Sequence, residues 1–382
     1  MNDEVLPFLD KLIAFPSVSA DGNIALIRWL EARLSSFGVA SRLTFDDGGG
    51  KANLFATIGN GEGGLILSGH TDVVPVAGQT WASDPFTAVR RGDRVFGRGA
   101  CDMKGYIAVA LSLVPDLVAH PSGQPVHFAF SYDEEIGCIG VRRMLADLAT
   151  LPARPRGCIV GEPTGMHAVV GHKGAGMYKV RITGRAAHSS LAPYGVNAIQ
   201  HAARIIERCR LIADRLKSHE KRHMGYDVPY STIQVNKITG GTGGNIVADN
   251  CEFLVDIRSL ASTSQAALLE EIRVFAETEL LPEMRSIAAE AAIEITQVGD
   301  VPAFDAATNS ELVTLLRAHG GKDCRHVAFG TEAGLFERAG IPTLICGPGS
   351  IEQAHKPDEF VEIDQLVACD RMLRGIFALP SS

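Results

Sequence analysis

The sequence predicts an α/β catalytic domain interrupted by a smaller α+β domain. In the first and last parts of the chain, amphipathic segments typical of helices alternate with short apolar runs, which indicates a mixed, mostly parallel sheet covered by helices. Near Met177 the pattern changes to strand, helix, strand, strand, helix, strand, the order of a ferredoxin-like unit. We expect the catalytic domain at 1–177 and 301–382 and the inserted domain at 178–300.

The individual elements follow from periodicity, β-branched content and turn residues. In the first part we expect helices at 21–38 and 104–114 and strands at 65–74, 126–135 and 158–164. The inserted part has a strand from Met177, strands at 232–241, 252–260 and 292–299, and helices at 197–216 and within 264–285. The last part has a helix at 310–320, apolar runs at 325–330 and 342–349, and a closing helix at 364–379.

Composition excludes several classes of protein. A length of 382 residues is more than one hydrophobic core usually serves, which favours two domains. The 36 basic and 44 acidic side chains give a net charge of -8 without a long basic run, so we expect no nucleic-acid partner. No apolar window is long enough for a membrane span and no export signal is present, so we expect a cytoplasmic protein.

The first candidate for metal binding is at the end of the apolar run LILSGHTDVV. His70 lies where the predicted strand ends, which is where open α/β sheets bind their ligands. Asp72 shares its face, and a metal-bound imidazole commonly donates its other N–H to such a carboxylate. Alone, such a pair is more often a polar strand end than a metal site.

Two further motifs supply carboxylates. GRGACDMKG places Asp102 at the entry to an apolar helix, where it could also act as an N-cap. FAFSYDEEIG ends a strand in Asp133, Glu134 and Glu135, three acids whose repulsion calls for cations or protons. On extended backbone Glu134 and Glu135 point in different directions, which suits one as a metal ligand and the other as a general base.

The last two candidates are Glu162 in CIVGEPTG, after a short strand, and His355 in the loop GPGSIEQAHKPDEF. Imidazole and carboxylate ligands together suit zinc, cobalt or manganese, and a carboxylate can bridge two ions. The sequence therefore predicts a site for divalent metal ions.

In these motifs the chain resembles the two-metal amidohydrolases that include acetylornithine deacetylase, succinyl-diaminopimelate desuccinylase and carboxypeptidase G. The motifs SGHTDVVP, GRGACDMKG, DEEIG, GEPT, GRAAHSS, GGTGGNIV, DIRS and GTEAG, then AHKPDEF, follow in that order over nearly the whole chain. The resemblance implies an inserted lid domain that forms a homodimer, and two ions, Zn²⁺ or Co²⁺, that activate a water for amide hydrolysis.

The resemblance also implies a role for each site residue. Asp102 would bridge the ions, His70 and Glu162 would complete one site, and Glu135 and His355 the other. Glu134 would be the general base, and Asp72 would orient His70. From the lid, His188 would stabilise the oxyanion in the partner subunit's site, and Asn245 and Arg258 would hold the substrate's carboxylate.

The C-terminal stretch GTEAGLFERAGIPTLICGPG is similar to the acetylornithine deacetylase branch. There Glu332 takes a position that is Asp in related branches, and an extra acid would suit a substrate with a cationic amine. The resemblance implies hydrolysis of N2-acetyl-L-ornithine to L-ornithine and acetate in arginine biosynthesis. N-acetylcitrulline, succinyl-diaminopimelate or another small N-acylated amino acid is the alternative substrate. A related aminopeptidase and a non-catalytic module of the same fold are the other two alternatives.

Overall fold

The computed structural model describes residues 3–19, 21–121, 123–150 and 154–380, which form two compact units. The catalytic unit comprises Met1–Gly171, Asp305–His326 and Thr331–Ser382, and the lid unit comprises His172–Phe304 and Val327–Gly330. The expected boundary at 177/178 falls inside strand β9 (Gly174–Thr183). The alternation of buried and exposed residues that marks the change of domain is visible only after that strand has begun, so the sequence pattern places the boundary late.

The large sheet of the catalytic unit has a parallel centre and antiparallel margins. Strands β6, β3, β7 and β15 lie side by side in that order and are parallel to one another. On one side β2 and β1 continue the sheet with antiparallel pairing, and on the other side β15 pairs with β8 in the same way. Within the described residues the sheet contains nine strands: β1 (Ser41–Phe45), β2 (Ala52–Ile58), β3 (Leu65–His70), β6 (Val126–Ser131), β7 (Gly157–Val160), β8 (His167–His172), β13 (Phe304–Asp305), β14 (Lys322–Val327) and β15 (Thr343–Ile345).

Helices cover both faces of this sheet, as its near-continuous apolar strands require. On β3, Leu65 and Leu67 belong to the main hydrophobic cluster, whereas Ile66, also fully buried, points to the other face. Buried side chains of six helices fill the main cluster: α1 (Val5–Ile13), α2 (Ile24–Ser35), α3 (Gly105–Ser112), α4 (Val114–Ala119), α9 (Glu311–Ala318) and α11 (Ile363–Ile376). Outside that cluster, α5 (Ile139–Leu148) and α10 (Ala333–Arg338) contact each other and the central strands.

A small antiparallel sheet brings the C-terminal loop beside the start of α3. It consists of β4 (Val89–Arg91), β5 (Arg94–Phe96) and β16 (Phe360–Glu362), with β5 in the middle. The π-helical turn η1 (Ala100–Lys104) leads from β5 into α3. The small sheet therefore holds two segments together that are far apart in sequence: residues 97–102, before α3, and residues 353–359, before β16.

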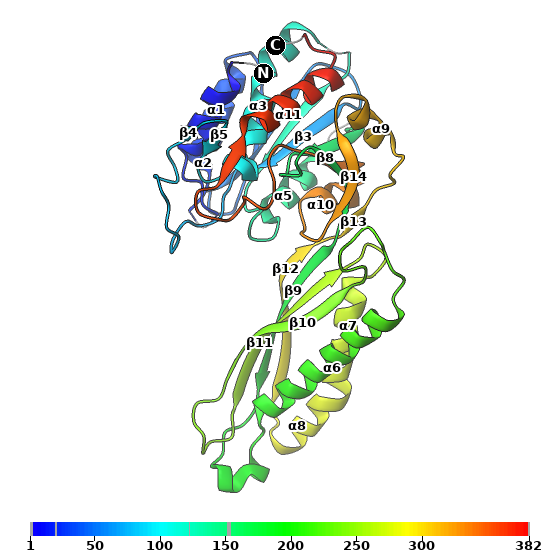
Figure 1. Cartoon of the computed structure of the whole chain (residues 1–382). Coiled ribbons are helices and arrows are strands. Elements are labelled where there is room, and N and C mark those ends of the chain that lie inside the picture. The colour runs from blue at the N-terminus through cyan, green and yellow to red at the C-terminus, as the bar shows by residue number, and fades with distance from the viewer. Residues whose placement is uncertain (1–2, 20, 122, 151–153, 381–382) are drawn as a thin grey trace. The chain divides into compact units, whose positions relative to one another are not determined.

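The lid unit is a ferredoxin-like α+β sandwich. Its strands are all antiparallel and lie in the order β10-β11-β9-β12, which is the spatial order of strands two, three, one and four of the βαββαβ pattern. In Figure 1 the helices α6, α7 and α8 lie on one face of this sheet. The elements are β9, η2 (Ser189–Tyr194), α6 (Ala198–His219), β10 (Thr232–Gly240), β11 (Asn250–Ser259), α7 (Gln265–Phe275), η3 (Ala276–Leu280), α8 (Leu281–Ile287) and β12 (Ala292–Val301).

The α/β fold with an inserted ferredoxin-like domain is thus the one that the sequence predicts. Among the described residues, no helix has the length and apolar content that crossing a bilayer requires.

Candidate metal centre

The order of the four parallel strands places the predicted ligands at one edge of the sheet. His70 ends β3, Glu134 and Glu135 follow β6, and Glu162 follows β7, which are three adjacent strands. His355 lies in the loop after β15, the next strand. Because the strands are parallel, their carboxyl ends lie at the same edge, where open α/β sheets bind ligands.

Asp102 lies between the two histidines. Its Oδ1 is 3.0 Å from His70 Nε2, and its Oδ2 is 3.3 Å from His355 Nε2. His355 Nε2 is also 3.1 Å from Glu135 Oε2, and His70 Nε2 is 3.8 Å from Glu162 Oε1. The five predicted ligands therefore form one continuous group, with the two oxygens of Asp102 facing its two halves.

Two sets of ligand atoms are close enough to surround an ion. His70, Asp102 and Glu135 form one set, and His70, Glu134 and Glu162 form the other, with the ligand atoms of each set within 4.8 Å of one another. Glu134, which the sequence assigns as the base, is thus as close to the ligands as the acids assigned to metal binding.

Burial and mutual repulsion dominate the electrostatics of this group. Burial, together with the charge of Asp102, raises the pKa of Glu162 well above its usual range and also raises that of Glu135. Burial raises the pKa of Glu134 in the same way, and Glu135 and Glu332 add to the effect. Asp102 differs: burial favours its protonated form, but the hydrogen bonds from His355 and His70 outweigh burial and keep its pKa below the ordinary value. Hydrogen bonds to Asp102 and Glu135 raise the pKa of His355 to about 10.

Three observations test whether divalent cations fit this group. His70 Nδ1 lies 2.9 Å from the backbone oxygen of Asp72, which can only accept, so Nδ1 carries the proton. In the neutral ring, the lone pair of Nε2 then faces the Asp102 carboxylate, an arrangement that is stable only if a proton or a cation shares the space. Glu162 Oε1 is buried without a hydrogen-bond partner, and the acids outnumber the histidines. The donor set of imidazole nitrogens and carboxylate oxygens fits zinc or cobalt.

Asp72 does not make the hydrogen bond that the sequence predicts. Its carboxylate oxygen is 3.6 Å from His70 Nδ1, beyond hydrogen-bond range, and the imidazole donates to the Asp72 backbone oxygen instead. The carboxylate accepts from the backbone N–H groups of Glu134 (3.1 Å) and Glu135 (3.3 Å) and from Ser19 Oγ (2.7 Å). Asp72 therefore positions the turn that carries Glu134 and Glu135, because its carboxylate accepts from the backbone N–H groups of both residues.

Asp133, the first acid of the run, points away from the metal ligands. Its carboxylate pairs with Lys51 Nζ at 2.7 Å, and its backbone has a positive φ of 55°. This reversal directs Asp133 to one side and Glu134 and Glu135 to the other. The sequence prediction that all three acids repel one another is therefore wrong for Asp133, whose charge Lys51 neutralises.

Glu332 is buried below the edge of the sheet. Only 1% of its surface is exposed, and Ser68 Oγ donates to it at 3.4 Å. Burial raises its pKa to about 7. Its charge also acts on Glu134, whose pKa it helps to raise. The contact between Glu332 and a substrate amine stays a prediction.

In the lid unit, His188 and Asn245 lie side by side. His188 forms a bridge with Ile246, and Ser189 N–H donates to the Asn245 backbone oxygen at 2.9 Å. His188 is exposed, and its Nδ1 accepts from the backbone N–H of Ser190 at 3.3 Å. In the neutral imidazole the proton is then on Nε2, so His188 presents a donor to solvent.

Arg258 lies at the other end of the lid sheet. It is on β11, whose first residue, Asn250, is the strand residue nearest in sequence to Asn245. At a rise of about 3.3 Å per residue, positions 250 and 258 are roughly 26 Å apart. Within one chain, Asn245 and Arg258 therefore cannot bind the same carboxylate.

Three polar residues near the ligands have no role in the sequence analysis. Glu359 accepts from the backbone N–H of Asp102 at 3.0 Å and pairs with Arg98 at 2.7 Å, and Gln79 donates to the His355 backbone oxygen at 2.9 Å. Arg98 and Glu359 lie inside the quoted motifs GRGACDMKG and AHKPDEF. Arg98 lies near Asp102 in sequence and Glu359 lies near His355, so the presence of opposite charges beside two predicted ligands is the signal from which this ion pair could have been predicted.

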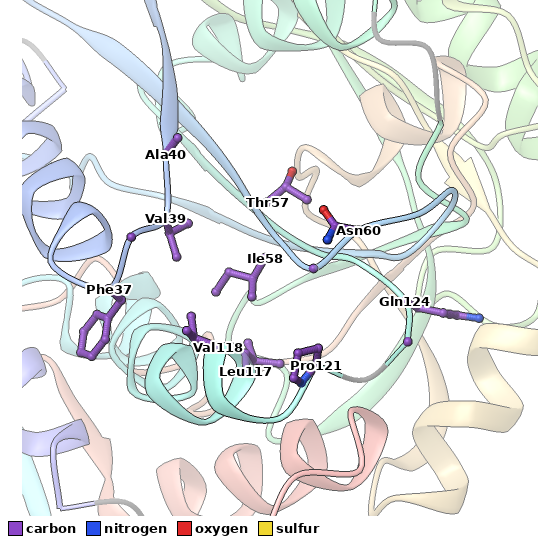
Figure 2. Close-up of a pocket in the computed structure, with 13 residues that line it drawn as sticks. Phe37, Val39, Ala40, Thr57, Ile58, Asn60, Leu117, Val118, Pro121 and Gln124 are labelled. Carbon is purple, nitrogen blue, oxygen red and sulfur yellow. The ribbon is translucent and has the colours of Figure 1, made fainter.

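A separate surface pocket of about 630 Å³ lies at the opposite ends of the same strands (Figure 2). Ile58, at the end of β2, lines it and pairs with Val126, the first residue of β6. The other lining residues shown include Val39, Leu117 and Gln124. None of the described lining residues titrates near neutral pH, so this pocket offers neither metal ligands nor acid–base groups.

Comparison with known proteins identifies the family. Residues 66–378 match the family described as peptidase family M20/M25/M40. The chain belongs to this family. It is 34% identical over 373 residues to the acetylornithine deacetylase of Proteus mirabilis, a match that covers 95% of this chain and 94% of the relative. The acetylornithine deacetylase of Photorhabdus laumondii is 33% identical with the same coverage.

Solved structures of the family share the fold. An M20 family metallo-carboxypeptidase from Sulfolobus solfataricus superposes with a TM-score of 0.78 at 21% identity and covers 99% of both chains. A Bacillus subtilis protein described as a dinuclear metal binding peptidase of the M20 family has a TM-score of 0.66 at 16% identity, with 98% of this chain and 96% of that chain covered. The family match and the relatives named acetylornithine deacetylase confirm the predicted resemblance and the predicted enzyme class, hydrolysis of an amide bond.

Proposed function

We propose that this chain is an acetylornithine deacetylase that cleaves the acetyl amide of N2-acetyl-L-ornithine with two divalent metal ions. The observation that carries the proposal is the group formed by His70, Asp102, Glu135, Glu162 and His355, in a chain whose similar relatives are named acetylornithine deacetylase over nearly their full length.

In this proposal His70 and Glu162 would hold one ion, Glu135 and His355 would hold the other, and Asp102 would be shared by both. The separate contacts of Asp102 Oδ1 with His70 and Oδ2 with His355 support the bridge. When bound, Zn²⁺ or Co²⁺ would polarise the amide carbonyl and lower the pKa of water toward about 7.

Glu134 is the proposed general base. Burial and neighbouring carboxylates raise its pKa, which favours uptake of a proton from the attacking water at its Oε atoms. The same carboxyl would return that proton to the departing amine of ornithine. Cys138 Sγ donates to Glu134 Oε1 at 3.3 Å, and Asp72 holds the backbone of this residue, so the carboxyl is positioned from both sides.

We further propose that the active enzyme is a homodimer in which the lid of each subunit completes the partner's site. His188 would donate from Nε2 to the developing oxyanion, a role supported by the acceptance of a backbone N–H at its Nδ1. Asn245 of the same lid would lie beside His188. Arg258, at the far end of β11, would come from the other chain of the dimer, and its planar guanidinium would bind the substrate carboxylate. The separation of Asn245 from Arg258 favours a site that two chains share.

The test is a comparison of kcat/KM for N2-acetyl-L-ornithine, N-acetyl-L-citrulline and N-succinyl-diaminopimelate with Co²⁺ present. We expect the highest value for acetylornithine. A higher value for either of the other two would contradict the proposed substrate, although not the proposed hydrolysis. No hydrolysis of any of the three would contradict the deacylase proposal itself.

A further inference from the structure

A buried ion pair holds the backbone at Asp102. Arg98 Nη1 and Glu359 Oε2 are 2.7 Å apart, and each side chain is 1% exposed. The other oxygen of Glu359 accepts from the backbone N–H groups of Cys101 at 2.9 Å and Asp102 at 3.0 Å. Burying both charges costs several kcal/mol per ion, so a pair of this kind is weak evidence for stability as such. Its effect here is to fix where the Asp102 backbone lies.

The same arginine reaches the loop that carries His355. Arg98 Nη2 donates to Gln79 Oε1 at 2.5 Å, and Gln79 Nε2 donates to the His355 backbone oxygen at 2.9 Å. Trp81 stacks on the guanidinium, with its ring centroid 4.9 Å from Arg98 Cζ, and its Nε1 donates to Gln79 Oε1 at 3.2 Å. A continuous chain of polar contacts thus links the backbone of Asp102 to that of His355.

The loop at His355 needs such support. The His355 side chain is 51% exposed, and its backbone has a φ of 63°, so the surrounding core does little to hold it. Further along the loop, Ala82 N–H donates to Asp358 Oδ1 at 2.9 Å and Gly97 N–H donates to the Glu359 backbone oxygen at 2.9 Å. The segment 79–98 therefore fixes the loop at several points, and Gln79 is the contact at His355 itself.

We propose that Gln79, Arg98 and Glu359, the Arg98 network, are positioning residues that set the distance between Asp102 and His355. They would thereby set the affinity for the ion that Asp102, Glu135 and His355 hold. The inference rests on the proposed two-ion centre. His70 and Glu162 receive no contact from the Arg98 network among the described residues, so the network acts on one ion more than on the other.

The test is a Zn²⁺ titration of the chelator-treated full-length chain, with Gln79→Met as the main variant. Gln79 is only partly buried, so the variant should fold, and it loses both the contact with Arg98 and the contact with His355. Gln365→Met is the matched control, because the same change is made in the same unit at a side chain whose Oε1 has no hydrogen-bond partner. His355→Ala identifies which of the two binding steps belongs to the Asp102–Glu135–His355 ion.

Loss of a group that orients a ligand typically weakens metal binding by about 10–100-fold. We expect Gln79→Met to weaken that one step at least tenfold, and Gln365→Met to leave both steps within about threefold of wild type. At saturating Zn²⁺ the kcat of Gln79→Met should return to near the wild-type value, since every ligand remains. Gln79→Glu should weaken the same binding step, because it keeps the acceptor for Arg98 but loses the donor to His355. Its added negative charge alone would strengthen cation binding, so weaker binding in this variant reports the lost contact.

Several results would overturn the inference. Unchanged dissociation constants in both Gln79 variants, or equal weakening of both steps, would show that the Arg98 network does not position His355. Wild-type protein that takes up no Zn²⁺ would overturn the two-ion centre as well, whereas two tight steps in wild type with an unaffected Gln79→Met would overturn the network alone.

Discussion

Replacing Asp72 with Asn should separate its structural effect from its effect on catalysis. The carboxylate accepts from Glu134 N–H at 3.1 Å and Glu135 N–H at 3.3 Å, and it is 2% exposed. Asn keeps one acceptor oxygen, so one of the two N–H groups faces an amide donor instead. A hydrogen bond to a charged group contributes about 1.5–3 kcal/mol, so we expect about 2 kcal/mol of lost stability. A shift of about 1 Å at the base costs roughly 100-fold in rate, and we expect that loss in kcat/KM.

Ser19→Ala is the matched control. Ser19 Oγ donates to the same carboxylate at 2.7 Å, but its removal leaves both contacts to the Glu134–Glu135 turn in place. We expect about 1 kcal/mol of destabilisation and a change in kcat/KM within about threefold. Stability would be measured by urea unfolding and activity with acetylornithine at saturating Co²⁺. Equal losses of activity in Asp72→Asn and Ser19→Ala, or near wild-type activity in Asp72→Asn, would refute the positioning of Glu134 by Asp72.

Three other predictions address the base, the dimer and the response to pH. Glu134→Gln should lower kcat by at least about 100-fold while metal analysis still finds two ions per chain, and turnover like that of wild type would contradict its role as base. Mixed His188→Ala and Glu134→Ala chains should recover about a quarter of wild-type activity once subunits exchange randomly. Half of the dimers then contain one chain of each kind, and each of these dimers has one intact site of its two. No recovery despite proven exchange would exclude catalysis across the dimer. Burial lowers the pKa of His127, whose ring lies between Thr57 Oγ1 and the Gly63 backbone oxygen. Its folded-state pKa therefore lies below the unfolded value of about 6.5, so its contribution to stability is complete above that pH and is lost as pH falls through the folded-state pKa. His127→Gln should flatten the fall in urea stability below about pH 6.5, and an unchanged slope would contradict this.

The parts of the site that follow buried strands could be predicted from the sequence. His70, Glu135 and Glu162 each follow a short apolar run, and a parallel sheet places the ends of such runs at one edge. The inserted domain could be predicted for a similar reason, because a change of hydrophobic period is a local property of the chain.

The contacts that orient these residues could not be predicted in the same way. Asp72 bonds to a turn 62 residues later, and Lys51 pairs with Asp133 across 82 residues. No local pattern determines which of two nearby acceptors an N–H group will choose, because the choice depends on tertiary geometry. For the same reason the sequence predicts an Asp72 side-chain contact with His70 where the imidazole donates to the Asp72 backbone.

Glu332 shows a different limit of sequence analysis. It takes a position that is Asp in related branches of the family, and an extra acid there would suit a substrate with a cationic amine. In the structure it is buried beside Ser68, and its pKa is raised to about 7. Local sequence does not encode the depth of a side chain below the surface, so the burial of Glu332 beside Ser68 becomes visible only in the folded structure.

Metal removal and replacement tests the central claim most directly. Purified protein would be treated with a chelator, freed of it, and assayed for acetate release from N2-acetyl-L-ornithine as Zn²⁺ or Co²⁺ is added back. We predict that activity is lost on chelation and returns as about two equivalents of metal are bound per chain, while circular dichroism shows that the fold persists throughout. Acetylornithine hydrolysis that continues in metal-free protein, or a folded protein that binds metal and releases no acetate, would contradict the account.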